Sequence, residues 1–247
     1  MLTSNAELYI RRLSMIRDIP ENNYLFSLPV IKYLRNNYID LEKAVTFIVG
    51  ENGTGKSRLI EAIAVTLGFN PEGGTKNFSF STEDSHSELY KYIAVGQNFR
   101  KPKDGFFLRA ESFYNAATYI DEITNVDPRM INYYGGKSLH RMSHGESFLA
   151  CMENRFGGNG LYILDEPEAA LSPMKLMRLM CIINELVERN SQFIISTHSP
   201  ILMTFPDADI LQIEGEEIKR VTFRETEHYQ LTKRFIENPE RMLKYLL

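Results

Sequence analysis

The sequence has no tryptophan and only two cysteines among its 247 residues. Both cysteines, Cys151 and Cys181, lie inside apolar runs, which predicts buried free thiols and gives no sign of a disulfide framework. The longest uninterrupted apolar runs, Phe148–Met152 and Leu179–Ile183, have five residues each, whereas a membrane-spanning helix needs about 20. The N-terminal residues also lack the apolar segment of a secretory signal. We therefore expect a cytoplasmic protein with no membrane insertion.

Positive charge is not in excess either, because 28 Lys and Arg stand against 32 Asp and Glu, for a formal net charge of −4. This balance argues against a protein that coats nucleic acid through bulk positive charge, although a local basic strip remains compatible with it. Hydrophobic residues (43%) and charged residues (24%) are present in the proportions of a globular domain. A chain of this length buries about 70–75% of its unfolded surface, so its core needs neither disulfide nor metal.

Short apolar runs alternate with helical patterns along most of the chain. The runs at 44–49, 161–164 and 192–196 are typical of buried strands, and the spacing at 56–67 and 173–189 predicts amphipathic helices. Buried strands that alternate with helices indicate an α/β fold with a mostly parallel core sheet. Further expected elements are strands at 8–13, 90–95 and 106–110, mostly helical segments at 112–142 and 145–156, an antiparallel hairpin at 210–213 and 218–223, and a helical tail at 227–247; residues 14–43 look irregular.

The first buried strand runs directly into the glycine-rich loop Gly50-Glu-Asn-Gly-Thr-Gly-Lys-Ser57, which fits the pattern G-x-x-x-x-G-K-[ST]. Glycines allow successive backbone N–H groups to turn toward phosphate oxygens, and the following helix points its positive end at the same anion. A lysine at this position reaches the β- and γ-phosphates, and the serine hydroxyl ligates Mg²⁺. The predicted nucleotide-binding residues are Gly50, Asn52, Gly53, Thr54, Gly55, Lys56, Ser57 and Arg58.

Two carboxylates end the strand at 161–164 and supply the groups that a phosphate loop needs nearby. Asp165 is predicted to hold Mg²⁺ or its water shell opposite Ser57. Glu166 is predicted to orient or deprotonate the attacking water. Two acids at a strand end are uninformative alone, but beside a phosphate loop they indicate nucleotide hydrolysis.

Three further segments follow in the order seen in ABC-type ATPases. Ser143-His-Gly-Glu-Ser147 resembles the signature motif usually written LSGGQ, Glu168–Ser172 resembles the D-loop, and Ile195–Pro200 resembles the switch-histidine segment. The motif sequences GENGTGKS, DEPEAALSP and ISTHSP look most like the SMC/RecF-type branch. Within it, FFLRAESF, SHGESF and TEHYQLT are similar to a group of small stand-alone bacterial ATPases of the AAA family.

This resemblance covers nearly the whole chain and implies a fold for it. We expect a P-loop NTPase of ABC-ATPase type, with helices that flank the core sheet, a small helical subregion and an antiparallel β edge. The expected organisation is one ABC-type ATPase domain over 1–247, in which the helical signature subregion spans about 112–150 and the tail about 226–247.

The resemblance also implies a homodimer, arranged head to tail, that forms when ATP and Mg²⁺ bind at its interface. Ser143, Gly145 and Glu146 would contact the γ-phosphate of the ATP held by the other subunit, and His198 would hydrogen-bond the γ-phosphate of its own. The chain departs from LSGGQ at His144 and at Glu146, where a carboxylate near phosphate is repelled unless it is paired or bridged by Mg²⁺.

Two positions of the family pattern have more than one candidate here. The residue that couples Mg²⁺ to the helical subregion is either Glu111, which follows the strand-like segment 106–110, or Gln97, which has the usual residue type. The aromatic side chain that stacks on adenine is either Tyr24 or Phe26, unless both fill the core.

The function that these motifs indicate is Mg²⁺-dependent ATP hydrolysis that drives dimer closure and opening. A nucleotide-gated binding module with little turnover is the alternative, and the nucleotide-binding subunit of a transporter is a third possibility. DNA repair or phage defence, with a DNA or protein effector as partner, follows only from analogy with the SMC/RecF-type branch.

Overall fold

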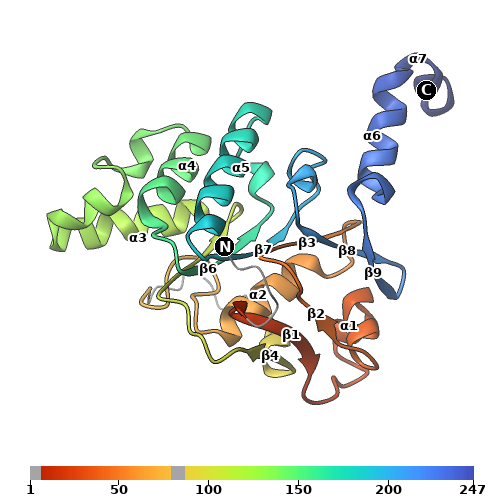
Figure 1. Cartoon of the computed structure of the whole chain (residues 1–247), viewed down its shortest axis with the longest axis horizontal. Coiled ribbons are helices and arrows are strands. Elements are labelled where there is room, and N and C mark those ends of the chain that lie inside the picture. Colours follow the sequence, from red (N-terminus) through yellow and green to blue (C-terminus); the bar gives the residue numbers. More distant parts are fainter. Residues whose placement is uncertain (1–6, 79–86) are drawn as a thin grey trace.

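A six-stranded sheet forms the centre of the computed structural model, which describes residues 7–78 and 87–247 (Figure 1). Its first five strands are parallel to their neighbours, and the last one closes the edge as an antiparallel hairpin. In spatial order the strands are β5 (Asp104–Arg109), β6 (Gly160–Asp165), β7 (Gln192–Ser196), β3 (Val45–Gly50), β8 (Asp209–Glu214) and β9 (Glu217–Val221). The prediction of a mostly parallel α/β sheet with an antiparallel edge is confirmed.

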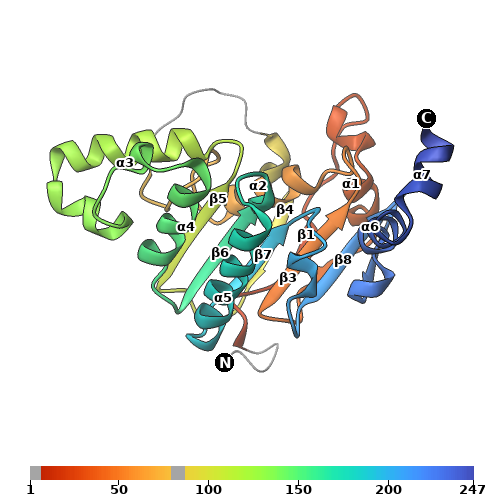
Figure 2. The same cartoon turned by 90° about the horizontal axis from the view of Figure 1, so that it is seen from above.

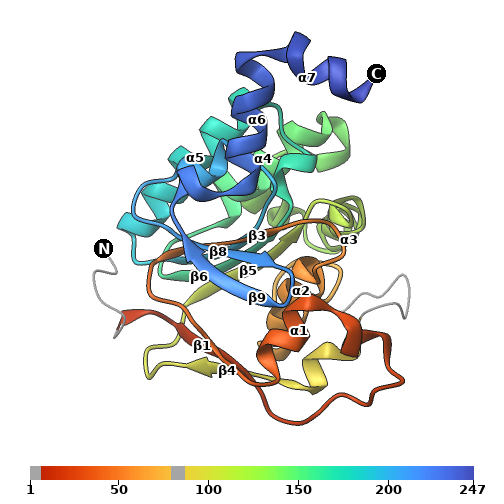
Figure 3. The same cartoon turned by 90° about the vertical axis from the view of Figure 1, so that its right-hand side faces the viewer.

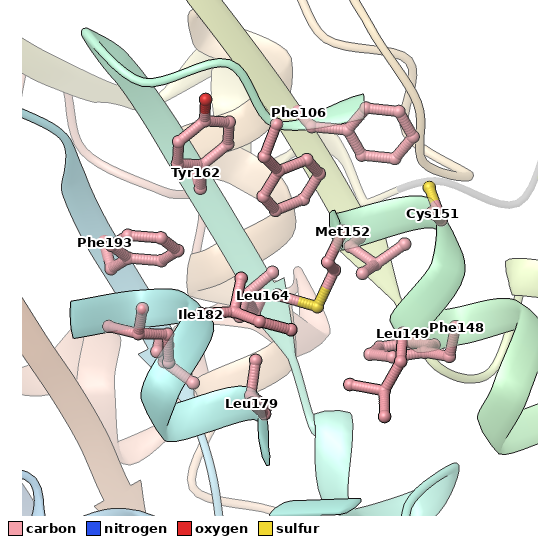
Figure 4. Packing of buried hydrophobic residues seen from close by; sticks show 14 of the residues in the cluster. Phe106, Phe148, Leu149, Cys151, Met152, Tyr162, Leu164, Leu179, Ile182 and Phe193 are labelled. Atoms are coloured by element: carbon pink, nitrogen blue, oxygen red, sulfur yellow. The ribbon is translucent and has the colours of Figure 1, made fainter. Parts of the chain in front are cut away.

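Both faces of this sheet are covered, which explains why its central strands are continuous apolar runs. Every residue of β3, β6 and β7 is buried, and side chains of a strand alternate between the faces. Tyr162 and Leu164 pack on one face, in a cluster with Phe106, Phe193 and α4 (Figure 4). Ile163, between them, belongs to the cluster on the other face. The sheet therefore lies between two apolar layers, which fix the positions of its strand ends.

Helices of different segments cover the two faces, as Figure 2 shows from above. The helices α4 (His144–Arg155) and α5 (Pro173–Glu188) lie on one face, and α2 (Lys56–Thr66) lies on the other. The helix α3 (Phe113–Val126) packs beside α4 through Phe113 and Phe148, whose ring centroids are 5.2 Å apart. Short 3₁₀ turns at Pro128–Tyr134 and Leu139–Arg141 join the two helices, so residues 112–155 are mostly helical.

A second, three-stranded antiparallel sheet lies next to α2. It consists of β2 (Ile39–Asp40), β1 (Ile10–Met15) and β4 (Ile93–Gln97). The segment 14–43, predicted to be irregular, contains β2 and the helix α1 (Pro29–Leu34). Six residues are too few to show helical periodicity, and short helices are stabilised mainly by packing. Here Val30 and Ile31 are fully buried in the cluster beneath α2.

One cysteine prediction is wrong. Cys151 is buried, but Cys181 is exposed. The apolar run around Cys181 belongs to α5, where Leu179, Ile182 and Ile183 face the core. Because successive residues of a helix are rotated by about 100°, one position within such a run points outward.

The C-terminal residues form α6 (Glu227–Glu237) and α7 (Pro239–Leu246), which project from the body of the molecule (Figures 1 and 3). Thr226 caps α6, and Pro239 starts α7, because a proline fits the first turn of a helix and cannot continue the preceding one. None of the described helices is long and apolar enough to cross a membrane.

Candidate functional site

The glycine-rich loop joins the end of β3 to the start of α2. Gly55 has φ +96°, and a Cβ at this position would lie 2.6 Å from Cγ1 of Val30, so both conformation and space require glycine. Lys56 is almost fully buried, and its Nζ donates to the carbonyl oxygens of Gly50 (2.7 Å) and Glu51 (2.8 Å). Burial lowers the pKa of Lys56. The lysine therefore lies across its own loop, bonded to carbonyl oxygens that a phosphate can replace as acceptors.

Asp165 at the end of β6 lies beside Ser57 of the loop. The Ser196 hydroxyl donates to Oδ1 of Asp165, and Nε of Arg109 lies 3.3 Å from Oδ2. Burial raises the pKa of Asp165, against the lowering effect of the Ser196 and Ser57 hydroxyls and of Arg109. A serine hydroxyl and a carboxylate side by side are hard oxygen donors of the kind that Mg²⁺ prefers. The pair fits the predicted metal site.

A cavity of about 390 Å³ opens over this pair. Its lining comes from the loop, from the ends of β5 and β6, and from the start of α4: Ser57, Arg109, Ala110, Glu111, His144, Asp165, Glu166 and Ala169. Within residues 7–78 and 87–247, no group of three or more His, Cys, Asp or Glu side chains is arranged to hold a metal ion.

Arg109 connects Asp165 to a buried acid on α2, a contact that the sequence patterns did not reveal. Its guanidinium lies 2.8 Å from Oε2 of Glu61 and 3.3 Å from Oε2 of Glu111. Glu61 is 1% exposed, accepts from the backbone N–H of Ser87 and also pairs with Arg58. Arg58, a predicted nucleotide-binding residue, thus points toward Glu61. The sequence signal that could have revealed this contact was Arg109 itself, a charged residue near the end of the mostly apolar segment 106–110.

Glu166 follows Asp165 in a left-handed conformation, with φ +48°. Its backbone N–H donates to the carbonyl oxygen of Ser196 (3.1 Å), which holds the turn. Such a conformation is uncommon for a non-glycine residue and is often found at functional sites. Burial, and then the charge of Asp165, raises the pKa of Glu166. The carboxylate is therefore a stronger base than an exposed glutamate and stays partly accessible.

His198 follows β7 and faces Glu166 across the site. Its Nε2 lies 3.7 Å from Oε1 of Glu166, and its backbone N–H donates to Oε1 of Glu168. Its Nδ1 lies 2.9 Å from Nε2 of His228, which belongs to α6. Burial, and then the charges of Lys56 and His228, lower the pKa of His198 to about 4, so the ring is neutral at neutral pH. His228 was not among the predicted site residues, although it lies within TEHYQLT.

The signature-like residues lie at the start of α4. Oε2 of Glu146 accepts from the backbone N–H (2.9 Å) and the hydroxyl (2.6 Å) of Ser143, as in a helix-capping pair. Nζ of Lys175 lies 3.5 Å from the Ser143 hydroxyl. A Cβ at Gly145 would lie 2.7 Å from the carbonyl oxygen of Ala170, so α4 approaches the D-loop-like segment closely. The carboxylate of Glu146 is thus paired within its own chain.

The two alternatives for the coupling residue occupy different places. Glu111 lines the cavity that also contains Asp165 and Glu166. Gln97 lies on β4 of the antiparallel sheet, where its Oε1 accepts from Lys101. Glu111 stays the prediction that the geometry favours.

The two alternatives for adenine stacking have other contacts. Tyr24 is 59% exposed, with its hydroxyl 3.4 Å from that of Ser87. The ring of Phe26 lies 4.3 Å from the Arg35 guanidinium. Neither contact selects one of them, so both remain predictions.

Two family models match parts of this chain. Residues 30–128 match a family model described as "AAA domain", and residues 146–204 match one described as "AAA domain, putative AbiEii toxin, Type IV TA system". The first span contains the glycine-rich loop, and the second contains Asp165, Glu166 and His198. No curated protein matches the chain.

Several solved structures are similar to the chain at low identity. One is cbiO1 from Clostridium perfringens, part of the ABC transporter complex cbiONQ (17% identity, 85% of this chain and 91% of that one, TM-score 0.48). Another is an SMC head domain from Thermotoga maritima (17%, 87% and 99%, TM-score 0.44). A third is a nucleotide-free ATP-binding cassette from an ABC transporter (17%, 94% and 97%, TM-score 0.49).

Proposed function

We propose that this chain, which is a P-loop protein of the ABC/SMC-like ATPase type, hydrolyses ATP with Mg²⁺ and uses ATP binding to close a homodimer. One observation carries the proposal. Three segments that are far apart in the sequence place Lys56, Asp165, Glu166 and His198 at one edge of the parallel sheet. Ligands of open α/β sheets bind at the carboxyl ends of the strands, where these residues lie.

The loop and α2 would hold the phosphates of ATP. Backbone N–H groups from Gly53 to Ser57 and the start of α2 would donate to phosphate oxygens. Lys56 would exchange its bonds to the Gly50 and Glu51 carbonyls for phosphate oxygens. Ser57 and Asp165 would hold Mg²⁺, which neutralises phosphate charge when it is bound.

Glu166 would act as the general base. Its raised pKa makes it a better proton acceptor than an exposed carboxylate, and its half-buried position lets a water molecule approach. The water proton would pass to the Glu166 carboxylate as the oxygen attacks the γ-phosphorus, while the bond from this phosphorus to the β,γ-bridging oxygen breaks and its electron pair leaves with ADP. His198, 3.7 Å from that carboxylate, would donate from Nε2 to the γ-phosphate and sense its presence.

The start of α4 would act on the nucleotide of a second subunit. Ser143 and the N-terminus of the helix present donors suited to an anion. Ser143 donates both its backbone N–H and its hydroxyl to Glu146, so its hydroxyl would exchange this carboxylate for a phosphate oxygen of the partner's ATP. Loss of the γ-phosphate would remove these contacts and reopen the dimer.

The variant Glu166→Gln tests the proposal. It keeps the size of the side chain and removes the base, so ATP is expected to bind without being cleaved and to trap a dimer. Size-exclusion chromatography with light scattering would give twice the monomer mass in ATP and the monomer mass in ADP. Adding Lys56→Ala should abolish the ATP-dependent dimer. A Glu166→Gln protein that binds ATP but stays monomeric would contradict the proposed mechanism.

The cycle would serve DNA repair or phage defence, through a DNA or protein partner. The description of the second matching model names a toxin–antitoxin system, which agrees with a role in defence. Because the chain has a net charge of −4, the positive surface that contacts DNA would have to come from a partner or from a basic strip formed by the dimer. A pull-down with Glu166→Gln, with and without ATP, identifies the partner; DNA or protein retained only with ATP would support this role, and no ATP-dependent capture would count against it.

A further inference from the structure

The C-terminal tail begins at the proposed catalytic site. Thr226, which caps α6, is completely buried, and the backbone N–H of Glu227 donates to Oε1 of Gln212 (3.3 Å). The next residue, His228, reaches His198. Beyond this first turn α6 buries none of its side chains, and the tail leaves the body (Figure 3). One histidine therefore lies between an otherwise exposed helix and the residue that would sense the γ-phosphate.

The two imidazole rings contact each other through one nitrogen of each ring, and this pair does not use the second nitrogen of either ring. Nδ1 of His198 and Nε2 of His228 are 2.9 Å apart, and the ring planes are inclined by 57°. The other two nitrogens, Nε2 of His198 and Nδ1 of His228, are buried and have no hydrogen-bond partner within the described residues. A neutral imidazole has one donor and one acceptor nitrogen, so the pair has two proton arrangements.

The surroundings of His198 distinguish these arrangements. If His228 donates to Nδ1 of His198, the proton of His198 lies on Nε2 and faces Oε1 of Glu166 at 3.7 Å. In the reverse arrangement, a lone pair on Nε2 faces that carboxylate and the space where a γ-phosphate would lie. Attraction to negative charge favours the first arrangement, because hydrogen bonds to ionised acceptors are the stronger ones.

We propose that Nε2–H of His228 donates to Nδ1 of His198 and so holds His198 in the tautomer whose Nε2 carries the proton. His228 is then a positioning residue: it does not touch the nucleotide but presents His198 as a donor to the γ-phosphate. The same bond joins the nucleotide site to α6 and α7, so a shift of His198 toward the phosphate is passed to the tail. This role rests on the proposed ATPase function.

The tautomer can be read directly by NMR of protein labelled with ¹⁵N-histidine, in the absence of nucleotide. Couplings between ring nitrogens and carbon-bound protons identify which nitrogen of His198 carries the proton. We expect the proton on Nε2 in the native chain and a mixture of tautomers in His228→Phe, which keeps a ring but removes the hydrogen bond. A proton on Nδ1 of the native His198, or an unchanged tautomer in His228→Phe, would overturn the inference.

The rate of ATP hydrolysis provides a second, functional test of the same inference. His228→Phe is expected to lower kcat for ATP hydrolysis about fivefold to tenfold, the size of one lost hydrogen bond, with little change in KM and in the melting temperature. His228→Gln, whose amide can donate from nearly the same place as Nε2, should restore most of kcat. Lys233→Ala, on the same helix and paired with Glu237, should behave like the native chain.

The outcomes separate this inference from the function on which it rests. If the native chain cleaves no ATP, the proposed function fails, and the tautomer measurement still decides the role of His228. If the native chain cleaves ATP but His228→Phe keeps full kcat, or His228→Gln fails to restore it, the positioning role is refuted while the ATPase stands.

Discussion

The carboxyl edge of the core sheet and the start of α4 differ in where their polar side chains find partners. At the sheet edge the partners come from distant segments: Ser196 donates to Asp165, and Arg109 pairs with Glu61. At the start of α4, Ser143 pairs with Glu146 three residues further along. The first arrangement is preorganised by the tertiary fold, whereas the second is complete within one helical turn. We infer that changes at the sheet edge affect stability and chemistry together, whereas changes at Ser143 affect mainly contacts with another subunit.

The largest effect is expected from Lys56→Ala at the sheet edge. Lys56 is the cation that would meet the β- and γ-phosphates, and loss of one such charge-stabilising group typically lowers turnover by at least about 100-fold. ATP binding measured by calorimetry and phosphate release should both fall. Lys43→Ala removes a lysine from an exposed ion pair with Asp207 and should leave both unchanged. Normal ATP binding by Lys56→Ala would show that the loop is not part of the ATP-binding site.

Arg109→Ala tests whether the long-range pairs hold the fold. The change leaves the buried Asp165 without its cation and leaves Glu61 paired only with Arg58, and breaking a buried pair from one side costs about 3–5 kcal/mol of unfolding free energy. Urea denaturation would measure this loss. Arg129→Ala removes an exposed arginine that pairs with Asp127 two residues away, and should leave the unfolding free energy nearly unchanged. Similar losses of unfolding free energy in both variants would show that long-range and local pairs do not differ in what they contribute to stability.

Ser143→Ala should separate dimerisation from nucleotide binding. The hydroxyl is expected to contact the partner's γ-phosphate, and losing one hydrogen bond to a charged group lowers turnover about tenfold. ATP affinity of the monomer should stay unchanged, and the ATP-dependent dimer formed by Glu166→Gln should weaken when Ser143→Ala is added. Ser138→Ala, whose hydroxyl donates to Asp121, is the matched control. Loss of monomer ATP affinity in Ser143→Ala would place this residue in its own subunit's site.

A smaller effect is expected from pH. Burial lowers the pKa of His198 to about 4 and also lowers that of His228, from an unfolded value of about 6.5. Between these values the unfolded chain binds more protons, so the stability that the pair contributes is present above about pH 6.5 and is lost as pH falls toward about 4. At pH 7 the unfolding free energies of the native chain and of His228→Phe should be similar, and toward pH 4 the native chain should lose more unfolding free energy, because it half-buries two such histidines and the variant only one. A constant difference across this range would contradict the assignment.

Much of the fold could be predicted because the residue pattern within each of these elements is enough to identify it. The strands β3, β6 and β7 are buried on both faces, so each is a continuous apolar run, and the periodicity of α5 identifies a long amphipathic helix. The helix α1 could not be predicted, since its six residues owe their helical conformation to the packing of Val30 and Ile31. Cys181 was misjudged because a five-residue apolar run does not show which residue of a helix faces outward.

What the sequence by itself determined is the set of groups at the site. The loop Gly50–Ser57 is predicted to bind phosphate through backbone geometry within eight residues, and Asp165 and Glu166 end a recognisable strand, so local spacing alone defines these candidate groups. Only the tertiary structure decided which partners surround these groups. Arg109 meets Glu61, and His228 meets His198, across 48 and 30 residues of chain. Such contacts have no periodic signature, because they depend on how the strands are ordered in the sheet and where α6 begins.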